Sequence, residues 1–404
     1  MRDAVVVEAV RTPVGKGKPG GSLHRVHPVD LLAHSLSALV ERAGIDPGSV
    51  DDVVVGAVTQ VGEQGVNVGR TAALAAGFPE SVPATTVDRQ CGSSQQAVHF
   101  AAQGVLSGAY DIAIAAGVES MSRVPMGANA LQPGTLEVAD LEGEAFRARY
   151  PEGLTSQGVS AELIAARWGL SRAQMDAFAV DSHAKAAAAR REGRFARQVA
   201  PLKAGQADGS VALVADDEGI REGTSLEGLA RLKPAFQDPA VSARFPQVRW
   251  SVTAGNSSPL SDGSAALLVM TSERARQLGL TPRARLHSFA VVGDDPLLKL
   301  MGVVPATARV LARAGLRLDD VDLFEVNEAF ASVVLAWLAE TGADPAKVNV
   351  DGGALALGHP LGASGARIMT TLVDAMERRG ARYALQTMCE AGGLANATLL
   401  ERLG

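Results

Sequence analysis

The sequence predicts an α/β protein built from two related halves and an inserted segment, and three observations carry this prediction. First, the halves register without a gap at one offset: Ala43-Gly44 matches Ala314-Gly315 (314 − 43 = 271), and Val50-Asp51 matches Val321-Asp322 (321 − 50 = 271). Second, short apolar runs alternate with helix-like segments, which is typical of strands buried on both faces. Third, prolines and charged residues interrupt this alternation between roughly residues 121 and 247. The period is far too long for a solenoid.

The first half contains three strand-like runs and one helix of particular interest. Residues 53–58 and 112–116 are short apolar runs of the buried-strand type, and residues 84–87 are also strand-like. Cys91 follows the last of these runs. A helix is expected directly after it, with apolar positions at Ala97, Val98, Ala101, Ala102 and Val105.

The interrupting stretch is interpreted as an insertion that covers the first half. Within it, residues 171–174 have the Ser-x-x-Gln form of a capping box and predict a helix that runs to Gly193. The alternating pattern resumes with a strand over residues 284–289. The next helix is expected to open at Pro305 and to close at Gly315.

Composition agrees with a large enzyme of the cytoplasm. The 404 residues are 47% hydrophobic and 20% charged, enough for an extensive core in two or three domains. A net charge of −6 leaves no broad basic surface for nucleic acid or an anionic membrane. No apolar run reaches membrane-spanning length, and we expect no signal or transit peptide. Two cysteines are too few for a disulfide framework, which fits free thiols in a reducing cytoplasm.

Cys91 is a candidate nucleophile because it stands where a helix begins. Free backbone N–H groups and the positive end of the helix dipole stabilise a thiolate, so the pKa of Cys91 is expected below the usual value of about 8.5. The alternative is a small buried residue at a tight turn.

The second half supplies groups that suit such a nucleophile. A glycine-dense turn over residues 350–365 holds His359 between Gly358 and Pro360, where it would serve as the base for Cys91. Asn327 and Glu328 follow a strand, and Cys389 occupies the position that Val118 has in the first half (389 − 118 = 271). Each residue considered alone also has a structural interpretation. His359 would be an ordinary turn residue, Asn327 would be an N-cap, and Cys389 would pack in the core.

Four segments resemble the signatures of the thiolase family, in the family's order and over nearly the whole chain. They are the turn at Cys91, the run 327–330, the run 358–365 and Cys389 ahead of glycines. Residues 252–263 resemble the CoA-contacting loop of that family, and residues 219–224 the segment near the adenine. The resemblance implies a five-layer αβαβα fold, with one half at 1–120 and 248–278, a loop domain at 121–247 and the other half at 279–404.

The resemblance also implies a mechanism. Cys91 would carry the acyl group, His359 would accept its proton, and Cys389 would exchange a proton with the α-carbon. One oxyanion hole would combine His359 with a water held by Asn327, and the other the backbone N–H groups of Cys91 and Ala391. The implied CoA contacts are Ser258, Arg221, Ala254, Gly255, Leu260 and Met301. CoA and acyl-CoA are then substrates, no metal or permanently bound cofactor is expected, and a homodimer or homotetramer is implied.

The chain departs from the family pattern at several positions, which leaves the substrate open. Ala391 replaces a common glycine, residues 394–395 replace a Gln-Gly pair, and Ser94 replaces a frequent glycine. Short-chain biosynthetic members carry His-Met where this chain has Ser156-Gln157. The stretch 91–96 is more similar to degradative thiolases, including those that act on steroid-derived acyl chains.

Three alternatives to a degradative thiolase stay open. A biosynthetic acetyl-CoA acetyltransferase would run the same chemistry toward acetoacetyl-CoA. A decarboxylating ketoacyl synthase generally uses two histidines, and Cys389 discriminates against it. A non-catalytic acyl-CoA or lipid-binding protein would have no reason to keep Cys91, Asn327, His359 and Cys389 together.

Other polar residues are expected to be structural. His24, His27 and His34 are interpreted as ordinary loop histidines without a metal. His99 is expected in the core and His183 on the surface of its helix. Glu328 is interpreted mainly as a structural partner of the Asn327 loop.

Overall fold

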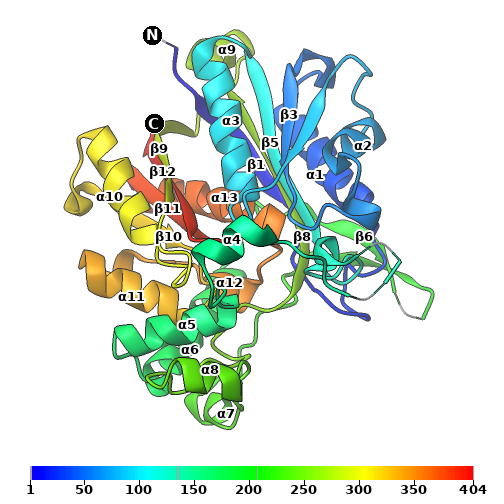
Figure 1. Cartoon of the computed structure of the whole chain (residues 1–404). Helices are drawn as coiled ribbons and strands as arrows, with labels where there is room; N and C mark the ends of the chain where they lie inside the picture. The colour runs from blue at the N-terminus through cyan, green and yellow to red at the C-terminus, as the bar shows by residue number, and fades with distance from the viewer. Residues whose placement is uncertain (1, 133, 136, 207, 404) are drawn as a thin grey trace.

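The computed structural model describes residues 2–132, 134–135, 137–206 and 208–403. Its main feature is a ten-stranded sheet with the path β10-β11-β12-β9-β1-β8-β5-β3-β4, and β2 pairs with β8 at its side (Figure 1). The strands of this sheet are β1 (Val5–Arg11), β2 (Gly15–Lys16), β3 (Asp52–Gly56), β4 (Ala84–Val87), β5 (Ile112–Ser120), β8 (Ser261–Met270), β9 (Ala284–Gly293), β10 (Leu323–Val326), β11 (Tyr383–Glu390) and β12 (Leu394–Arg402). A separate hairpin pairs β6 (Leu202–Gly205) with β7 (Val211–Val214).

Thirteen α-helices accompany the strands in the part of the chain that is described. They are α1 (Pro28–Ala43), α2 (Val68–Ala75), α3 (Ser93–Ser107), α4 (Gly143–Arg149), α5 (Gln157–Arg167), α6 (Arg172–Arg191), α7 (Leu226–Ala230), α8 (Pro239–Arg244), α9 (Ser272–Gln277), α10 (Val303–Ala314), α11 (Ala331–Thr341), α12 (Ala354–Leu357) and α13 (Leu361–Arg379). None of these described helices is long and apolar enough to cross a membrane.

The sheet consists of two equivalent half-sheets. We call β1-β8-β5-β3-β4 the first half-sheet and β9-β12-β11-β10 the second half-sheet. β3 and β10 begin 271 residues apart (323 − 52 = 271), and so do β5 and β11 (383 − 112 = 271). The half-sheets meet where β1 pairs with β9. The predicted repeat is therefore confirmed at the level of strand order.

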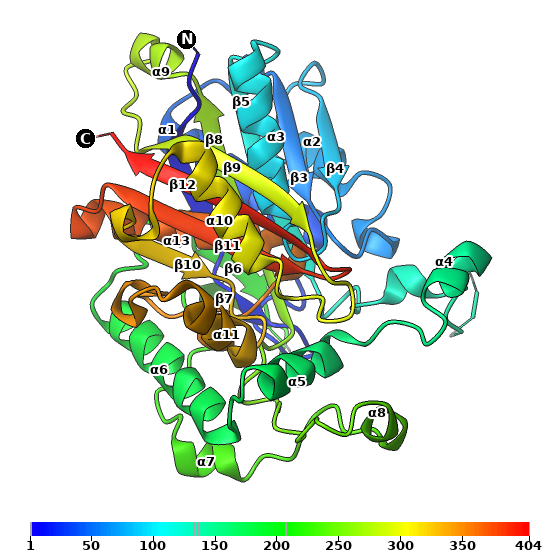
Figure 2. The same cartoon turned by 60° about the vertical axis from the view of Figure 1, so that its left-hand side comes forward.

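Helices complete five layers around the two half-sheets. Helices α1 and α2 pack on the outer face of the first half-sheet, and α10 and α11 on the outer face of the second. Helices α3 and α13 contact strands of both half-sheets and lie between them (Figures 1 and 2). The predicted αβαβα order is confirmed.

Glycines allow the two central helices to approach closely. A Cβ on Gly365 of α13 would lie 2.2 Å from the backbone nitrogen of Gln95 on α3. A Cβ on Gly117 of β5 would lie 2.3 Å from the carbonyl oxygen of Gly362. Only glycine permits these contacts. Because α3 follows the Cys91 turn and α13 follows the His359 turn, this packing brings the two turns to one place.

Local signals in the sequence predicted several element ends correctly. Strand β4 covers residues 84–87, and Ser171 forms the capping box with Gln174 at the start of α6. Helix α6 ends at Arg191, two residues before the predicted end. Helix α10 closes at Gly315 (φ 67°) but opens at Val303, two residues before Pro305. A proline is tolerated there because the first-turn N–H groups have no partner within the helix.

The segment between β5 and β8 packs more widely than predicted. Its helices α5 and α6 pack against α11 (Figure 2), and α6 also packs against α12. The segment therefore covers helices of the second half-sheet and not the first half alone. This packing also corrects the prediction for His183. That side chain is buried on α6, and its Nδ1 accepts a hydrogen bond from the backbone N–H of Arg221 at 3.2 Å.

Candidate active site

A cavity of about 430 Å³ contains Cys91 and His359 together. Its lining is mostly apolar, with side chains from both half-sheets and from the inserted segment. The lining residues are Cys91, Met121, Met126, Ser156, Gln157, Gly158, Phe236, Ser257, Ser258, Pro259, Leu260, Ala329, Phe330, His359 and Leu361. An apolar cavity with a few convergent polar groups is the usual form of a small-molecule site.

Cys91 lies in a tight turn between β4 and α3. Gln90, just before it, has a φ of 49°, in the left-handed region that non-glycine residues seldom adopt. Gly92 caps the helix, and a Cβ there would lie 1.9 Å from the Glu390 carboxylate. The turn is thus pressed against the end of β11 and holds Cys91 with 5% of its surface exposed.

The prediction of a lowered Cys91 pKa is not met in this structure. Burial raises the pKa of the Cys91 thiol, and the neighbouring Cys389 and Glu390 raise it further. Removal from water disfavours the charged thiolate more than the helix start favours it. The resting side chain is therefore a thiol, and a proton acceptor is needed to activate it.

His359 is held with its Nε2 unprotonated and able to act as a base. The Ser364 hydroxyl donates its proton to the carbonyl of Pro360 at 2.9 Å, so it can only accept from His359 Nδ1, 2.6 Å away. The Nδ1 then carries the hydrogen and Nε2 carries the lone pair. Asn327 Nδ2 donates to that Nε2 at 3.4 Å, which agrees with the same tautomer.

The surroundings of His359 keep it neutral and oriented. Burial lowers the pKa of His359 to about 3, and the nearby Arg367 lowers it as well. The backbone N–H of His359 donates to Ser261 Oγ at 3.0 Å. A Cβ on Gly358 (φ 102°) would lie 2.5 Å from the same oxygen, so glycine is required before the histidine.

Asn327 links His359 to the second cysteine. Burial raises the pKa of the Cys389 thiol to about 12, whereas Asn327 lowers it. Cys389 is fully buried at the end of β11, behind the cavity surface. The Oδ1 of Asn327 has no hydrogen-bond partner among the described residues. Asn327 lies in the run before α11 and is not its N-cap, which is Phe330.

Glu328 supports the Asn327 run from behind. Its buried carboxylate accepts hydrogen bonds from Ser182 Oγ at 2.7 Å, Asn349 Nδ2 at 2.8 Å and the Leu355 backbone N–H at 3.1 Å. These contacts join α6, the run before α12 and α12 itself. The expected structural role of Glu328 is consistent with them.

Glu119 and Glu390 occupy equivalent positions in the two halves (390 − 119 = 271), but they differ in their hydrogen-bond partners. Glu119 at the end of β5 accepts hydrogen bonds from Gln64 Nε2 and from backbone N–H groups of Val58, Thr59 and Gly362. Glu390 at the end of β11 has no partner for either oxygen among the described residues, and burial raises its pKa well above the usual value.

The predicted CoA contacts fall into two groups. Ser258 and Leu260 line the cavity. Ala254 and Arg221 are exposed outside the described lining, and Gly255 packs against Leu229 and Leu232. Met301 lies in the core of the second half-sheet with 5% exposure. Ala391 begins the turn between β11 and β12, directly after Glu390.

The remaining histidines have structural surroundings. His99 is fully buried, stacks on Phe289 and is 2.8 Å from Thr398 Oγ1. His24 Nδ1 contacts Ser122 Oγ at 3.0 Å, and His27 caps α1. His34 was predicted in a loop but lies within α1, where its Nε2 is 3.2 Å from the carbonyl of Ala200. Within the described residues, no group of three or more His, Cys, Asp or Glu side chains is placed to hold a metal ion.

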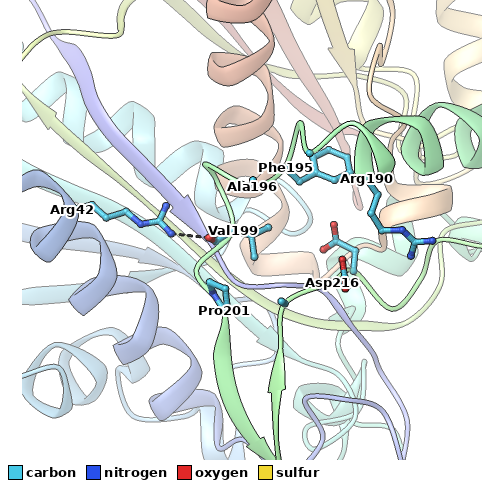
Figure 3. Close-up of a pocket in the computed structure, with 10 residues that line it drawn as sticks. Arg42, Arg190, Phe195, Ala196, Val199, Pro201 and Asp216 are labelled. Carbon is cyan, nitrogen blue, oxygen red and sulfur yellow. Dashed lines mark hydrogen bonds between the residues drawn. The ribbon is translucent and has the colours of Figure 1, made fainter.

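A second cavity, of about 410 Å³, has a different character (Figure 3). It lies between α1, the end of α6 and the run before β6. Arg42 donates to the carbonyl of Val199, and Arg190 pairs with Glu222 at 2.6 Å. The described residues that line it include neither cysteine nor histidine. Of these two cavities, only the first is lined by a cysteine and a histidine among the described residues.

Some residues of the site were not identified from the sequence. Ser364 determines the tautomer of His359, and its position five residues later on α13 was the available signal. Phe236 and Phe330 form one wall, with ring centroids 6.0 Å apart at an edge-to-face angle. Phe330 ends the signature run 327–330, but Phe236 belongs to no recognisable motif, so only the fold reveals the pair.

Comparison with known proteins identifies the family. The thiolase N-terminal domain matches residues 4–273, and the thiolase C-terminal domain matches residues 280–402. Because these matches cover nearly all of the chain, it belongs to the thiolase family.

Individual relatives cover the chain from end to end. A steroid 3-ketoacyl-CoA thiolase of Mycobacterium tuberculosis is 45% identical over the whole of this chain and 95% of its own length. A 3-ketoacyl-CoA thiolase of Pseudoalteromonas translucida is 45% identical over the full length of both. The crystal structure of the Bacillus anthracis acetyl-CoA acetyltransferase superposes with a TM-score of 0.88 at 37% identity, over all of this chain and 99% of that one.

Proposed function

We propose that the protein is an acyltransferase that cleaves 3-ketoacyl-CoA with CoA, giving acetyl-CoA and an acyl-CoA shortened by two carbons. The observation that carries this proposal is the pairing of a cysteine thiol with a neutral, base-ready imidazole in one apolar cavity. Full-length relatives named as 3-ketoacyl-CoA thiolases support the same reaction. The reaction is a reversible Claisen condensation.

Cleavage begins at Cys91. The thiol gives its proton to His359 Nε2, and the thiolate attacks the 3-keto carbon of the substrate. The bond between C2 and C3 then breaks, which leaves the acyl group on Cys91 as a thioester. The electron pair of that bond stays on C2 of the departing acetyl-CoA, where Cys389 delivers a proton.

The second step returns Cys91 to its starting state. The thiol of CoA gives its proton to the Cys389 thiolate and attacks the acyl-Cys91 carbonyl, and the leaving Cys91 thiolate takes back the proton held by His359. The shortened acyl chain departs as acyl-CoA. Both steps pass through tetrahedral oxyanions, which donors fixed in advance stabilise. His359 with a water held by Asn327, and the backbone N–H groups of Cys91 and Ala391, are proposed for these two roles.

The free oxygen of Asn327 supports its part in this scheme. A buried acceptor normally has a hydrogen-bond partner, but Asn327 Oδ1 has none among the described residues. Its amide nitrogen meanwhile donates to His359 Nε2. An uncommitted acceptor beside these groups is suited to a water that moves in with substrate.

CoA is proposed to enter along the run from Ser257 to Leu260, because all four residues of this run line the cavity. Arg221, Ala254 and Gly255 would contact its outer parts, and Met301 would act only through the core behind the cavity. CoA and acyl-CoA are substrates in this proposal. The domain boundaries given above, the cytoplasmic location and a homodimer or homotetramer stay predictions.

A panel of 3-ketoacyl-CoA esters assayed with CoA for acetyl-CoA release tests the proposed function. Release should depend on both substrates and should be lost in Cys91→Ala. If acetyl-CoA is released from none of the esters, the proposal is wrong. If only acetoacetyl-CoA is formed or cleaved, the protein is an acetyl-CoA acetyltransferase like the structural relative from Bacillus anthracis.

A further inference from the structure

Residues 294–300, between β9 and α10, form a loop that lies between the turn after Cys389 and the start of α5. We call it the bridging loop. The backbone N–H of Asp294 donates to the carbonyl of Gly393 at 2.7 Å, and a Cβ on Gly393 would lie 2.7 Å from the carbonyl oxygen of Asp294. On this side, the bridging loop is therefore fastened to the turn that contains Ala391, one of the proposed oxyanion donors.

The other side of the bridging loop holds the start of α5. The hydroxyls of Thr155 and Ser160 both donate to the carbonyl of Leu297, each at 2.9 Å. In the opposite direction, Lys299 Nζ donates to the carbonyl of Thr155. The side chain of Leu297 also packs in the apolar cluster that contains Val159 of α5. Because these bonds run both ways, they fix the helix start relative to the loop.

The backbone of Lys299 adopts an unfavourable conformation to make this contact. Its φ of 61° lies in the left-handed region that non-glycine residues seldom adopt. The N–H of Lys299 donates to the carbonyl of Asp295 at 2.8 Å, and the carboxylate of Asp295 accepts from the N–H of Leu297 at 2.8 Å. These bonds close the turn from which the lysine side chain reaches Thr155. Such strained backbone is concentrated at sites where a function depends on position.

The start of α5 transmits the position of the bridging loop to the cavity wall. Residues 156–158 follow Thr155 directly, and all three line the Cys91 cavity. A Cβ on Gly158 would lie 2.3 Å from the ring of Phe236, which meets the ring of Phe330 edge to face. Since the backbone of Gly158 already touches this ring, any shift of the helix start also moves the aromatic wall.

We propose that Lys299 is a positioning residue for the acyl chain: by holding Thr155 it fixes the first turn of α5 and the Phe236 ring, so that the wall fits chains longer than acetoacetyl. The inference rests on the proposed function and adds the element that sets its chain-length preference. Lys299 is outside the described cavity lining, so it acts through α5 and not by touching substrate. Because the bridging loop is also fastened behind Cys389, the wall is held at a fixed place relative to the reacting groups.

The test is the ratio of kcat/KM for 3-ketooctanoyl-CoA to kcat/KM for acetoacetyl-CoA. Both values scale with the amount of folded enzyme, so the ratio does not change when a variant is merely less stable. Lys299→Met keeps the apolar stem but removes the donor. If the wall loses contact with one or two methylenes, the ratio should fall about 4- to 16-fold. Lys299→Arg keeps a donor and should preserve the ratio, whereas Thr155→Val breaks the same junction from the other side and should lower it.

Lys347→Met is the matched control. Lys347 Nζ also donates to a backbone carbonyl, that of Val321 at 2.9 Å, but Lys347 is not among the described residues of the cavity lining. Its ratio should equal that of the unchanged protein. The proposal is overturned if Lys299→Met and Thr155→Val keep the unchanged ratio, or if Lys347→Met lowers it as much as they do. If the unchanged protein releases acetyl-CoA from none of the esters, the proposed function itself fails, and this inference fails with it.

Discussion

The hydroxyl of Ser364 lies 2.6 Å from Nδ1 of His359, and its own proton is committed to the carbonyl of Pro360. This relationship leaves one tautomer of the histidine, with Nε2 ready to accept a proton. Ser364→Ala should therefore lower kcat for thiolysis about 10- to 100-fold, since Nδ1 loses its partner in a buried site. KM should change much less.

Thr370→Val is a suitable control for that variant. Thr370 lies on the same helix and donates to the carbonyl of Ala366 in the same way, at 2.9 Å. Its hydroxyl is not one of the contacts of His359. Equal losses of kcat in Ser364→Ala and Thr370→Val would show that the effect comes from the helix and not from the tautomer.

Acetyl-CoA alone, with no acceptor, should leave an acetyl group on Cys91. Cys91 reaches the cavity surface, whereas Cys389 has no exposed surface. Peptide mass spectrometry should also find iodoacetamide on Cys91 before Cys389 is modified. An acetyl group on Cys389, or on no thiol of a protein active in thiolysis, contradicts the role given to Cys91.

His359→Ala and Cys389→Ala should damage different steps. Loss of His359 removes the base and an oxyanion donor, so acetyl transfer to Cys91 should fall by about 10²- to 10⁴-fold. Cys389→Ala should still form acetyl-Cys91 but should fail to exchange the α-protons of acetyl-CoA. The control variant His34→Ala, on α1, should keep both acetyl-Cys91 formation and α-proton exchange. Equal loss of acetyl-Cys91 in the first two variants would refute this division.

His99 should make the protein more sensitive to acid. Burial lowers its pKa to about 3 in the folded state, from the usual value of about 6.5. Below pH 6.5, His99 is protonated in the unfolded chain but stays neutral in the folded protein. The free energy of unfolding therefore falls as the pH falls. Between about pH 7.5 and about pH 5 this one histidine should lower the free energy of unfolding by about 2 kcal/mol.

His99→Gln isolates that contribution, because glutamine can still reach Thr398 but does not titrate. Urea unfolding is measured for both proteins at about pH 7.5 and about pH 5. The variant should lose about 2 kcal/mol less than the unchanged protein over this interval. An identical loss in both proteins would contradict the buried neutral state of His99.

The apolar wall predicts a preference for longer acyl chains. Each further buried methylene contributes about 0.8 kcal/mol, or about fourfold in kcat/KM, until the cavity is full. Thiolysis should therefore be faster for medium-length 3-ketoacyl-CoA esters than for acetoacetyl-CoA. Phe236→Ala should shift the optimum to longer or bulkier chains, whereas Phe146→Ala on α4 should not. A steady fall in kcat/KM beyond acetoacetyl-CoA would favour the acetyltransferase.

Features that depend on neighbouring residues could be predicted from the sequence. The boundaries of β4 follow from a local strand pattern, and the start of α6 follows from Ser171 and Gln174, which cap it directly. The 271-residue repeat predicted the matching strands of the two halves, because both halves contain the same supersecondary unit. Cys91 and His359 were located because a turn with glycines is visible in the chain itself.

Features that depend on docking between distant segments could not be predicted. His183 has the sequence surroundings of a surface residue, but α12 packs over its helix. The pKa of Cys91 follows its burial and its neighbours Cys389 and Glu390, which no local pattern discloses. The presence of Gln157 in the Cys91 cavity likewise requires the inserted segment to be in place.

The contrast between Glu119 and Glu390 shows how far a duplicated scaffold has diverged. At equivalent positions, the Glu119 carboxylate joins the loop at Val58 and Thr59 to the start of α13, whereas the Glu390 carboxyl has no hydrogen-bond partner among the described residues and lies against the Cys91 turn. The halves have thus become complementary and are no longer interchangeable. A chimera made from two copies of the first half would contain the fastening carboxylate twice and would lack both the imidazole and the second thiol.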